Sequence, residues 1–169
     1  IRMFFNKLTS HTEISKFNTD GFSFDRICNA LIQLTYTIRG EELGETALAL
    51  SASFAKLNLP MTAFILLCGF AMKKRWEKIL VCCVGMLLYS FQYPYAAIFF
   101  LLPLLSMIHE EQELSPQNAF MFFALLLPVL WLPIMDVEGS ELSLIYARFQ
   151  ICMIIYLLYI IIRAFKEIV

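Results

Sequence analysis

Long, nearly charge-free apolar stretches most restrict how this 169-residue chain can fold. Its charged residues gather instead in segments 1–45, 73–78, 109–113, 136–148 and 163–167. A charge at the centre of a bilayer costs about 3 kcal/mol or more, so this segregation is typical of a chain that crosses a membrane repeatedly. The chain is 60% hydrophobic and 16% charged, against about 45–50% and about 25% in ordinary soluble domains. We therefore predict an integral membrane protein, with a soluble all-helical protein as the alternative.

The lengths of the apolar stretches predict an all-α fold, a polytopic transmembrane helical bundle of about five spans. The predicted spans cover residues 57–72, 77–91, 96–109, 118–135 and 147–164. The second and third should form a helical hairpin that turns at 92–95, because one straight helix over 79–108 would be about 45 Å long against about 30 Å of hydrocarbon. One helix kinked at Pro94 is the alternative.

Residues 1–56 are predicted to form a separate polar and amphipathic helical segment before the bundle of residues 57–169. Apolar residues recur there at helical spacing, at Phe22, Phe24, Ile27, Leu31, Leu34 and Ile38. This spacing predicts an amphipathic helix that is too polar to span, capped by Ser23 and ended by Gly40. A second helix, rich in alanine and serine, should begin at Glu41, and Pro60 should break or restart it.

A basic cluster next to Trp76 gives the expected orientation. The cluster contains Lys73, Lys74, Arg75 and Lys78. Basic loops next to spans stay on the cytoplasmic side. Because each span crosses the membrane once, segments 109–117 and 163–166 are then also predicted to lie on the cytoplasmic side. Segments 1–56, 92–95 and 136–148 then lie on the outer face.

Several classes of function are disfavoured by composition and motifs. A net charge of −1 gives no basic footprint for nucleic acid. The five cysteines form no C-x-x-C pair, and four lie in apolar stretches as small hydrophobic residues. We find no Gly-rich phosphate loop, nucleophile elbow or Cys–His pair, so no cofactor is expected, and nothing indicates the oligomeric state. Since the sequence opens with Ile1, we also expect an upstream part of the protein to precede it.

Two acidic groups were considered as sites. His109, Glu110, Glu111 and Glu113 lack metal-binding helical spacing, so we interpret them as a solvated helix end and predict no metal site. Asp136, Glu138, Glu141 and Arg148 share an outer loop and could supply an acid or base, but a solvated loop is the preferred interpretation.

The turn between the second and third spans is the preferred candidate for substrate binding. It places Ser90, Gln92, Tyr93 and Tyr95 at one membrane face, with Pro94 restricting the backbone. Tyrosine offers an apolar face and a hydroxyl, which suit a polar lipid or a sugar. Plain interfacial anchoring by the two tyrosines is the alternative.

Several short motifs together resemble a known family. They are Lys7-Leu8, Gly21-Phe22-Ser23-Phe24, Ser51-Ala52-Ser53-Phe54, Trp76-Glu77-Lys78, Ser90-Phe91-Gln92-Tyr93-Pro94-Tyr95 and Phe99-Phe100-Leu101-Leu102-Pro103-Leu104. Over roughly residues 5–165 the pattern resembles the C-terminal half of bacterial family-87 glycosyltransferases, although Gln92-Tyr93 with Pro94 departs from their Ser-Tyr-x-Tyr turn.

The resemblance implies a GT-C type fold in the bacterial cytoplasmic membrane. It also implies transfer of a sugar from a polyprenyl-phosphate carrier at the outer face. The acidic catalytic residue of such enzymes is expected in an early outer loop, which would precede Ile1, so no residue here is assigned a catalytic role. A transporter or flippase is a second hypothesis, and a structural membrane protein is a third. Because no ionisable residue lies in mid-span and no inverted repeat is visible, the transporter is disfavoured.

Two substitutions in the full-length protein, Tyr93→Phe and Tyr95→Phe, test whether this turn binds a substrate. If the hydroxyls bind a lipid head or its sugar, at least one variant should express normally and lose sugar transfer several-fold. The reason is that a lost hydrogen bond costs about 0.5–1.5 kcal/mol. Anchoring needs aromatic bulk alone, so unchanged transfer in the double variant would leave the turn as an anchor.

Overall fold

The computed structural model describes residues 21–40, 44–89, 98–111, 113, 115–128 and 144–168. Within them the chain is helical and has no strand. The helices are α2 (Phe24–Arg39), α3 (Glu45–Ala55), α4 (Asn58–Cys68), the 3₁₀ helix η1 (Gly69–Ala71), α5 (Arg75–Tyr89), α6 (Leu101–Glu110), α7 (Pro116–Leu126) and α8 (Leu144–Ile168). The predicted all-α class is therefore confirmed for the described residues.

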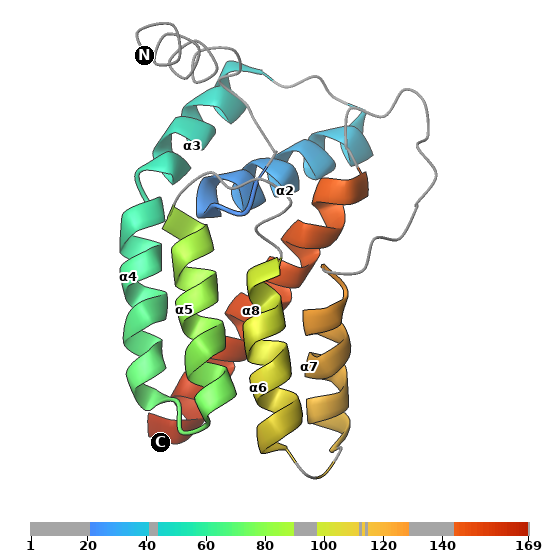
Figure 1. The fold of residues 1–169 in the computed structure, drawn as a ribbon. Coiled ribbons are helices and arrows are strands. Elements are labelled where there is room, and N and C mark those ends of the chain that lie inside the picture. The colour runs from blue at the N-terminus through green and yellow to red at the C-terminus, as the bar shows by residue number, and fades with distance from the viewer. Residues whose placement is uncertain are drawn as a thin grey trace, which may run out of the picture.

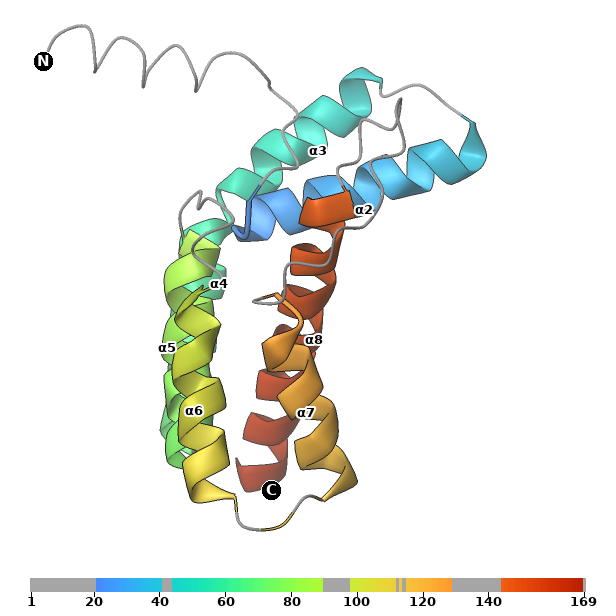
Figure 2. The same ribbon diagram turned by 45° about the vertical axis from the view of Figure 1, so that its right-hand side comes forward.

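Helices α4, α5, α6 and α7 stand side by side, and the long helix α8 runs obliquely behind them (Figure 1). Helices α2 and α3 lie at one end of this bundle, and α2 lies across it (Figure 2). Helices α5 and α6 run antiparallel and in contact, as the predicted hairpin requires, so the kinked-helix alternative is wrong. The turn between them lies outside the described residues.

The core lies where α5 meets α8 and α6. One face of α5 is fully buried, at Trp76, Leu80, Val84 and Leu87. These residues recur at intervals of three or four, so they lie on one side of the helix. The facing side of α8 buries Met153, Tyr156 and Ile160 at the same spacing, and the Tyr156 ring packs on Phe100, with 4.7 Å between ring centroids.

The amphipathic helix predicted over 22–38 is α2. Gly40 ends it in the left-handed conformation, with φ of 68°, which glycine adopts without steric cost. Ser23 is the N-cap residue as predicted, but its side chain makes no capping hydrogen bond. Its backbone carbonyl instead accepts from the N–H groups of Arg26 and Ile27.

Pro60 lies in the first turn of α4, where a residue without an N–H leaves no helical hydrogen bond unmade. Helices α3 and α4 meet at a bend of 47°. The predicted restart of the helix near Pro60 is therefore confirmed, with the break three to four residues before the proline, at Lys56–Leu57.

One helix in the described part of the chain is long and apolar enough to cross a membrane, over Phe149–Glu167. The bent pair α3–α4 would be a second if it is one span. Helix α5 has 15 residues and α6 has 10, so α5 is only about 22 Å long at 1.5 Å per residue. The larger count of about five spans stays a prediction.

Candidate functional site

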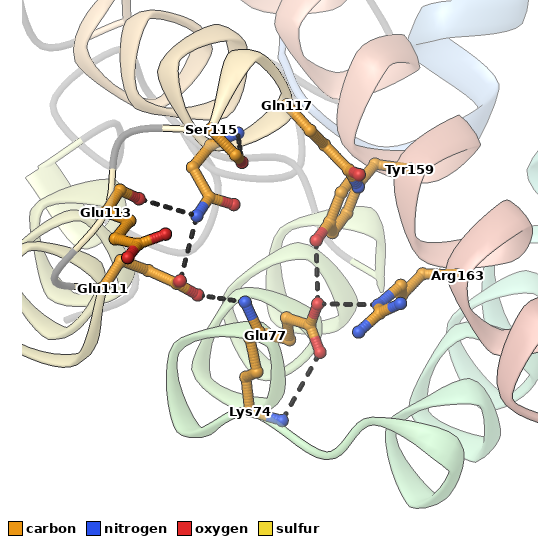
Figure 3. Close-up of a pocket in the computed structure, with 9 residues that line it drawn as sticks. Lys74, Glu77, Glu111, Glu113, Ser115, Gln117, Tyr159 and Arg163 are labelled. Carbon is orange, nitrogen blue, oxygen red and sulfur yellow. Dashed lines mark hydrogen bonds and ion pairs between the residues drawn. The ribbon is translucent and has the colours of Figure 1, made fainter.

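Three segments that are far apart in the sequence meet at the end of the bundle opposite α2 and α3 (Figure 1). They are the start of α5 with the loop before it, the connection from α6 to α7, and the last turns of α8. A cavity of about 340 Å³ lies between them (Figure 3). Its lining is polar and consists of Lys74, Glu77, Glu111, Glu113, Ser115, Gln117, Asn118, Tyr159 and Arg163.

Glu77 is the buried centre of this site, with a side chain only 1% exposed. Its Oε1 accepts hydrogen bonds from the Tyr159 hydroxyl at 2.8 Å and from Arg163 Nε at 3.0 Å. Its Oε2 lies 3.4 Å from the backbone nitrogen of Lys74, a weak form of the contact that a third-position glutamate makes at a helix start. Burying a carboxylate is costly unless it is paired and hydrogen-bonded, and here it is both.

The guanidinium of Arg163 joins Glu77 to a second carboxylate. Its Nη2 lies 3.0 Å from Glu167 one turn later on α8, and Glu167 also pairs with Lys73 in the loop before α5. The Tyr159 ring stacks on Trp76 with centroids 5.6 Å apart and planes at 29°. Ion pairing and aromatic packing therefore hold the start of α5 against the end of α8.

Glu111 ties the same end of α5 to α6 and α7. Its carboxylate pairs with Lys74 and accepts from Trp76 Nε1 and Asn118 Nδ2, each at 2.9 Å. Burial by itself would raise the pKa of Glu111, but these donors and the charge of Lys74 together hold the pKa below its ordinary value. The carboxylate is therefore stabilised in its charged form.

Glu110 caps the start of α5 from the end of another helix. Its two oxygens accept from the backbone N–H groups of Arg75 and Trp76, both at 3.2 Å. A carboxylate at a helix start satisfies otherwise unbonded N–H groups and suits the positive end of the helix dipole. Ser115 caps α7 more locally, because its Oγ accepts from the N–H of Asn118 at 3.2 Å.

Most of these groups already have their partners, and this decides what the cavity can do. The carboxylate of Glu77 has two strong donors, and that of Glu111 has three. A general base needs a carboxylate that is available to the substrate, so neither glutamate suits that role. Glu113, Ser115 and Gln117 are exposed at the rim. The arrangement is a joint between four helices, and we call Glu77, Arg163, Tyr159, Glu111 and Lys74 the polar joint.

The described lining of this cavity includes none of the sequence-predicted substrate residues. Ser90, Gln92, Tyr93 and Tyr95 lie outside the described residues, as do Asp136, Glu138 and Glu141, and the side chain of Arg148 is not described. The C-terminal end of α5 and the N-terminal end of α6 lie at the end of the bundle away from the polar joint (Figure 2).

Helix α6 ends at Glu110, and His109, Glu110 and Glu113 are exposed, as expected of a solvated helix end, but this end also makes contacts that the sequence did not predict. Glu110 and Glu111 bind the start of α5, because the hairpin brings residues 34 to 37 positions apart into contact. In the residues that the structure describes, no three His, Cys, Asp or Glu side chains are grouped so that they could hold a metal ion.

Sequence reasoning missed the partnership of Glu77 with Tyr159 and Arg163, which are 82 and 86 positions away. One signal was present. Glu77 lies in a basic cluster at the start of an apolar helix, and Arg163 lies near the end of another. Opposite charges at the edges of two apolar helices are candidates for an ion pair, although their contact depends on which helix ends meet.

No protein-family model, curated protein or solved structure matches this chain.

The polar joint predicts a stability effect for Glu77→Ala. Removing this carboxylate leaves the Tyr159 hydroxyl and Arg163 Nε without their shared acceptor. The free energy of unfolding should fall by about 1–3 kcal/mol, since Arg163 keeps Glu167 as a partner. The measurement is the apparent melting temperature of the purified full-length protein.

Lys73→Ala is the matched control for Glu77→Ala. It also breaks an ion pair of this site, but the Lys73 side chain is 74% exposed. Exposed ion pairs contribute little to stability, so its melting temperature should stay close to that of the parent. Equal losses in both variants would contradict the central place of Glu77.

The lowered pKa of Glu111 predicts that the joint weakens in acid. The folded pKa lies below the unfolded value, for which the ordinary value is 4.5. The stabilisation is therefore complete above that pH and is lost as the pH falls through the folded pKa. Between pH 6 and about pH 3 the parent should lose more thermal stability than Glu111→Gln, which has no carboxylate there. The same loss in both proteins would show that Glu111 is not the responsible group.

Proposed function

We propose that this chain is the membrane-embedded part of a glycosyltransferase similar to family 87, which transfers a sugar from a polyprenyl-phosphate carrier at the outer face. The resemblance of the sequence motifs supports the chemistry. The helical bundle supports a membrane setting, and the main support is the apolar surface that the bundle exposes. A transporter, a flippase or a structural membrane protein is the alternative.

Large apolar side chains are exposed on each helix from α3 to α8, which is the observation that carries the proposal. They include Phe70 at 88%, Phe123 at 66%, Leu67 at 64%, Leu105 at 61% and Phe165 at 61%. Soluble monomers rarely expose apolar patches larger than a few hundred Å². A bundle with its own buried core and an apolar outer surface fits a lipid environment, in which that surface is covered by acyl chains.

The two ends of the bundle differ, and this suggests an orientation. The end with the polar joint carries Lys73, Lys74, Arg75, Arg163 and Lys166. By the positive-inside rule this end faces the cytoplasm, since acidic residues in the same segments contribute little. Helices α2 and α3 at the opposite end then lie on the outer face, where a lipid-linked sugar would be used.

The position of the charged groups favours an enzyme or a scaffold over a transporter. In the described residues of α4 to α8, charged side chains occur near the helix ends and none lies in the middle of a helix. Transporters place ionisable groups near the bilayer midplane, where they bind coupling ions or substrate. Glu77 and Arg163 are instead paired with each other at one end of the bundle.

Orientation can be tested by labelling single introduced cysteines in intact cells with a membrane-impermeant reagent. Thr37→Cys and Gln92→Cys should be labelled from outside, whereas Lys166→Cys should be labelled only after the membrane is opened. All three positions avoid the polar joint, and the parent protein corrects for its own five cysteines. Equal labelling of Lys166→Cys and Thr37→Cys in intact cells would contradict the orientation.

Activity can be tested with the full-length protein in vesicles that contain a polyprenyl-phosphate carrying a radiolabelled hexose. We expect the label to leave the carrier at the outer face. Movement of the intact carrier across the bilayer would favour a flippase. An unchanged carrier with normal folding would favour a structural protein.

A further inference from the structure

One apolar stripe runs along the whole of α2 and passes from buried to exposed halfway. Its members are Phe24, Ile27, Leu31, Leu34 and Ile38, which alternate at intervals of three and four and therefore lie on one face of the helix. Ile27 is 3% exposed and belongs to the core of the bundle, and Phe24 packs against that core. Leu31, Leu34 and Ile38 are 49%, 46% and 76% exposed.

The direction of α2 explains this change. The helix lies across the end of the bundle, and its C-terminal half extends beyond α8 (Figure 2). Ile27 belongs to the core of the bundle and Phe24 packs against it, so the stripe on the overhanging half continues a face that the protein covers at the other half. The overhanging part, residues 31–39, is about 13 Å long at 1.5 Å per residue.

The buried half of α2 holds this direction firmly. The backbone N–H of Asp25 donates to Asn58 Oδ1, and Asn58 Nδ2 donates back to Asp25 Oδ1, both at 2.9 Å. The Phe22 ring packs on Phe149 of α8 at 5.2 Å between centroids, and Phe24 meets Phe54 of α3 edge-on at 6.4 Å. Contacts to α3, α4 and α8 together make α2 a fixed arm.

The hydroxyl groups near the exposed stripe are already bonded within the helix. Thr35 Oγ donates to the Leu31 carbonyl at 2.8 Å, and Thr37 Oγ donates to the Gln33 carbonyl at 2.9 Å. A hydroxyl costs free energy in an apolar setting unless it is hydrogen-bonded, and these internal bonds remove most of that cost. The Thr35 side chain, which lies beside the stripe, therefore tolerates contact with lipid.

The end of α2 suits a membrane interface as well. Arg39 is in the last turn and is exposed, so its long side chain can reach lipid phosphates while its stem lies along apolar surface. Gly40 then ends the helix. Helices that lie in the interface combine such an apolar face with basic residues on the polar side.

We propose that the C-terminal half of α2 is an in-plane membrane anchor, whose Leu31, Leu34 and Ile38 side chains rest in the acyl-chain boundary of the outer leaflet. The inference rests on the membrane setting of the proposed function. The occupant of the exposed stripe is the lipid surface, because the stripe continues a face that packs on the bundle, the outer surface of that bundle is itself apolar, and the helix ends in a basic residue.

Depth-dependent quenching of tryptophan fluorescence tests the anchor in the full-length protein. Ile38→Trp places the probe on the stripe, and Gln33→Trp places it on the other side of the helix, a little more than one turn earlier. Both are reconstituted in phosphatidylethanolamine–phosphatidylglycerol vesicles, with or without bromine on the acyl chains. The native Trp76 and Trp131 contribute equally to both variants. The Ile38 probe should lose most of its added emission in brominated vesicles, and the Gln33 probe should lose little.

Leu158→Trp separates failure of the anchor from failure of the membrane setting. Leu158 is 55% exposed in the middle of α8, on the outer surface of the bundle. Quenching at Leu158 and Ile38 but not at Gln33 supports the anchor. Quenching at Leu158 with equal or no quenching at Ile38 and Gln33 overturns the anchor alone. Without quenching at Leu158, the membrane setting fails, and the anchor fails with it.

Discussion

The carboxylate of Glu77 is the group on which the arrangement of the helices depends. It is buried at the start of α5, so it requires a cation and hydrogen-bond donors, and α8 supplies both through Arg163 and Tyr159. A buried ion pair gains little net free energy over well-packed apolar groups, but a buried charge without its partner is strongly unfavourable. We infer that Glu77 acts mainly by excluding arrangements in which α5 and α8 meet in another register.

The neighbouring contacts extend this constraint to the rest of the bundle. Glu110 and Glu111 at the end of α6 bind the first residues of α5, and Asn118 adds the start of α7. The helices pack through apolar surfaces along their length, and ion pairs and hydrogen bonds also join them at one end. Apolar packing alone permits sliding along the axis, whereas directional hydrogen bonds at the helix ends do not.

The opposite end of the molecule has a different construction and suits a different task. There α2 is held through Asp25 and Asn58, crosses the bundle, and continues beyond it with its apolar stripe uncovered. A bundle with a charged end and an amphipathic arm at the other end has two unlike faces. In the proposed transferase, the charged end is the cytoplasmic side and the arm lies on the side where a lipid-linked sugar is used.

The local patterns of the sequence determined the helices, most of their approximate ends and the amphipathic stripe of α2, although α7 ends at Leu126 and the predicted span ends at 135. These follow from the spacing of apolar residues and from Gly40 and Pro60, which act within a few positions. The hairpin of α5 and α6 also followed, because one helix of that length does not match a bilayer. Only the tertiary structure decided that Glu77 meets Arg163, that Glu110 caps α5, and that half of the α2 stripe is covered. These contacts join residues about 30 to 90 positions apart, and their partners depend on which helix ends pack together, which local spacing does not specify.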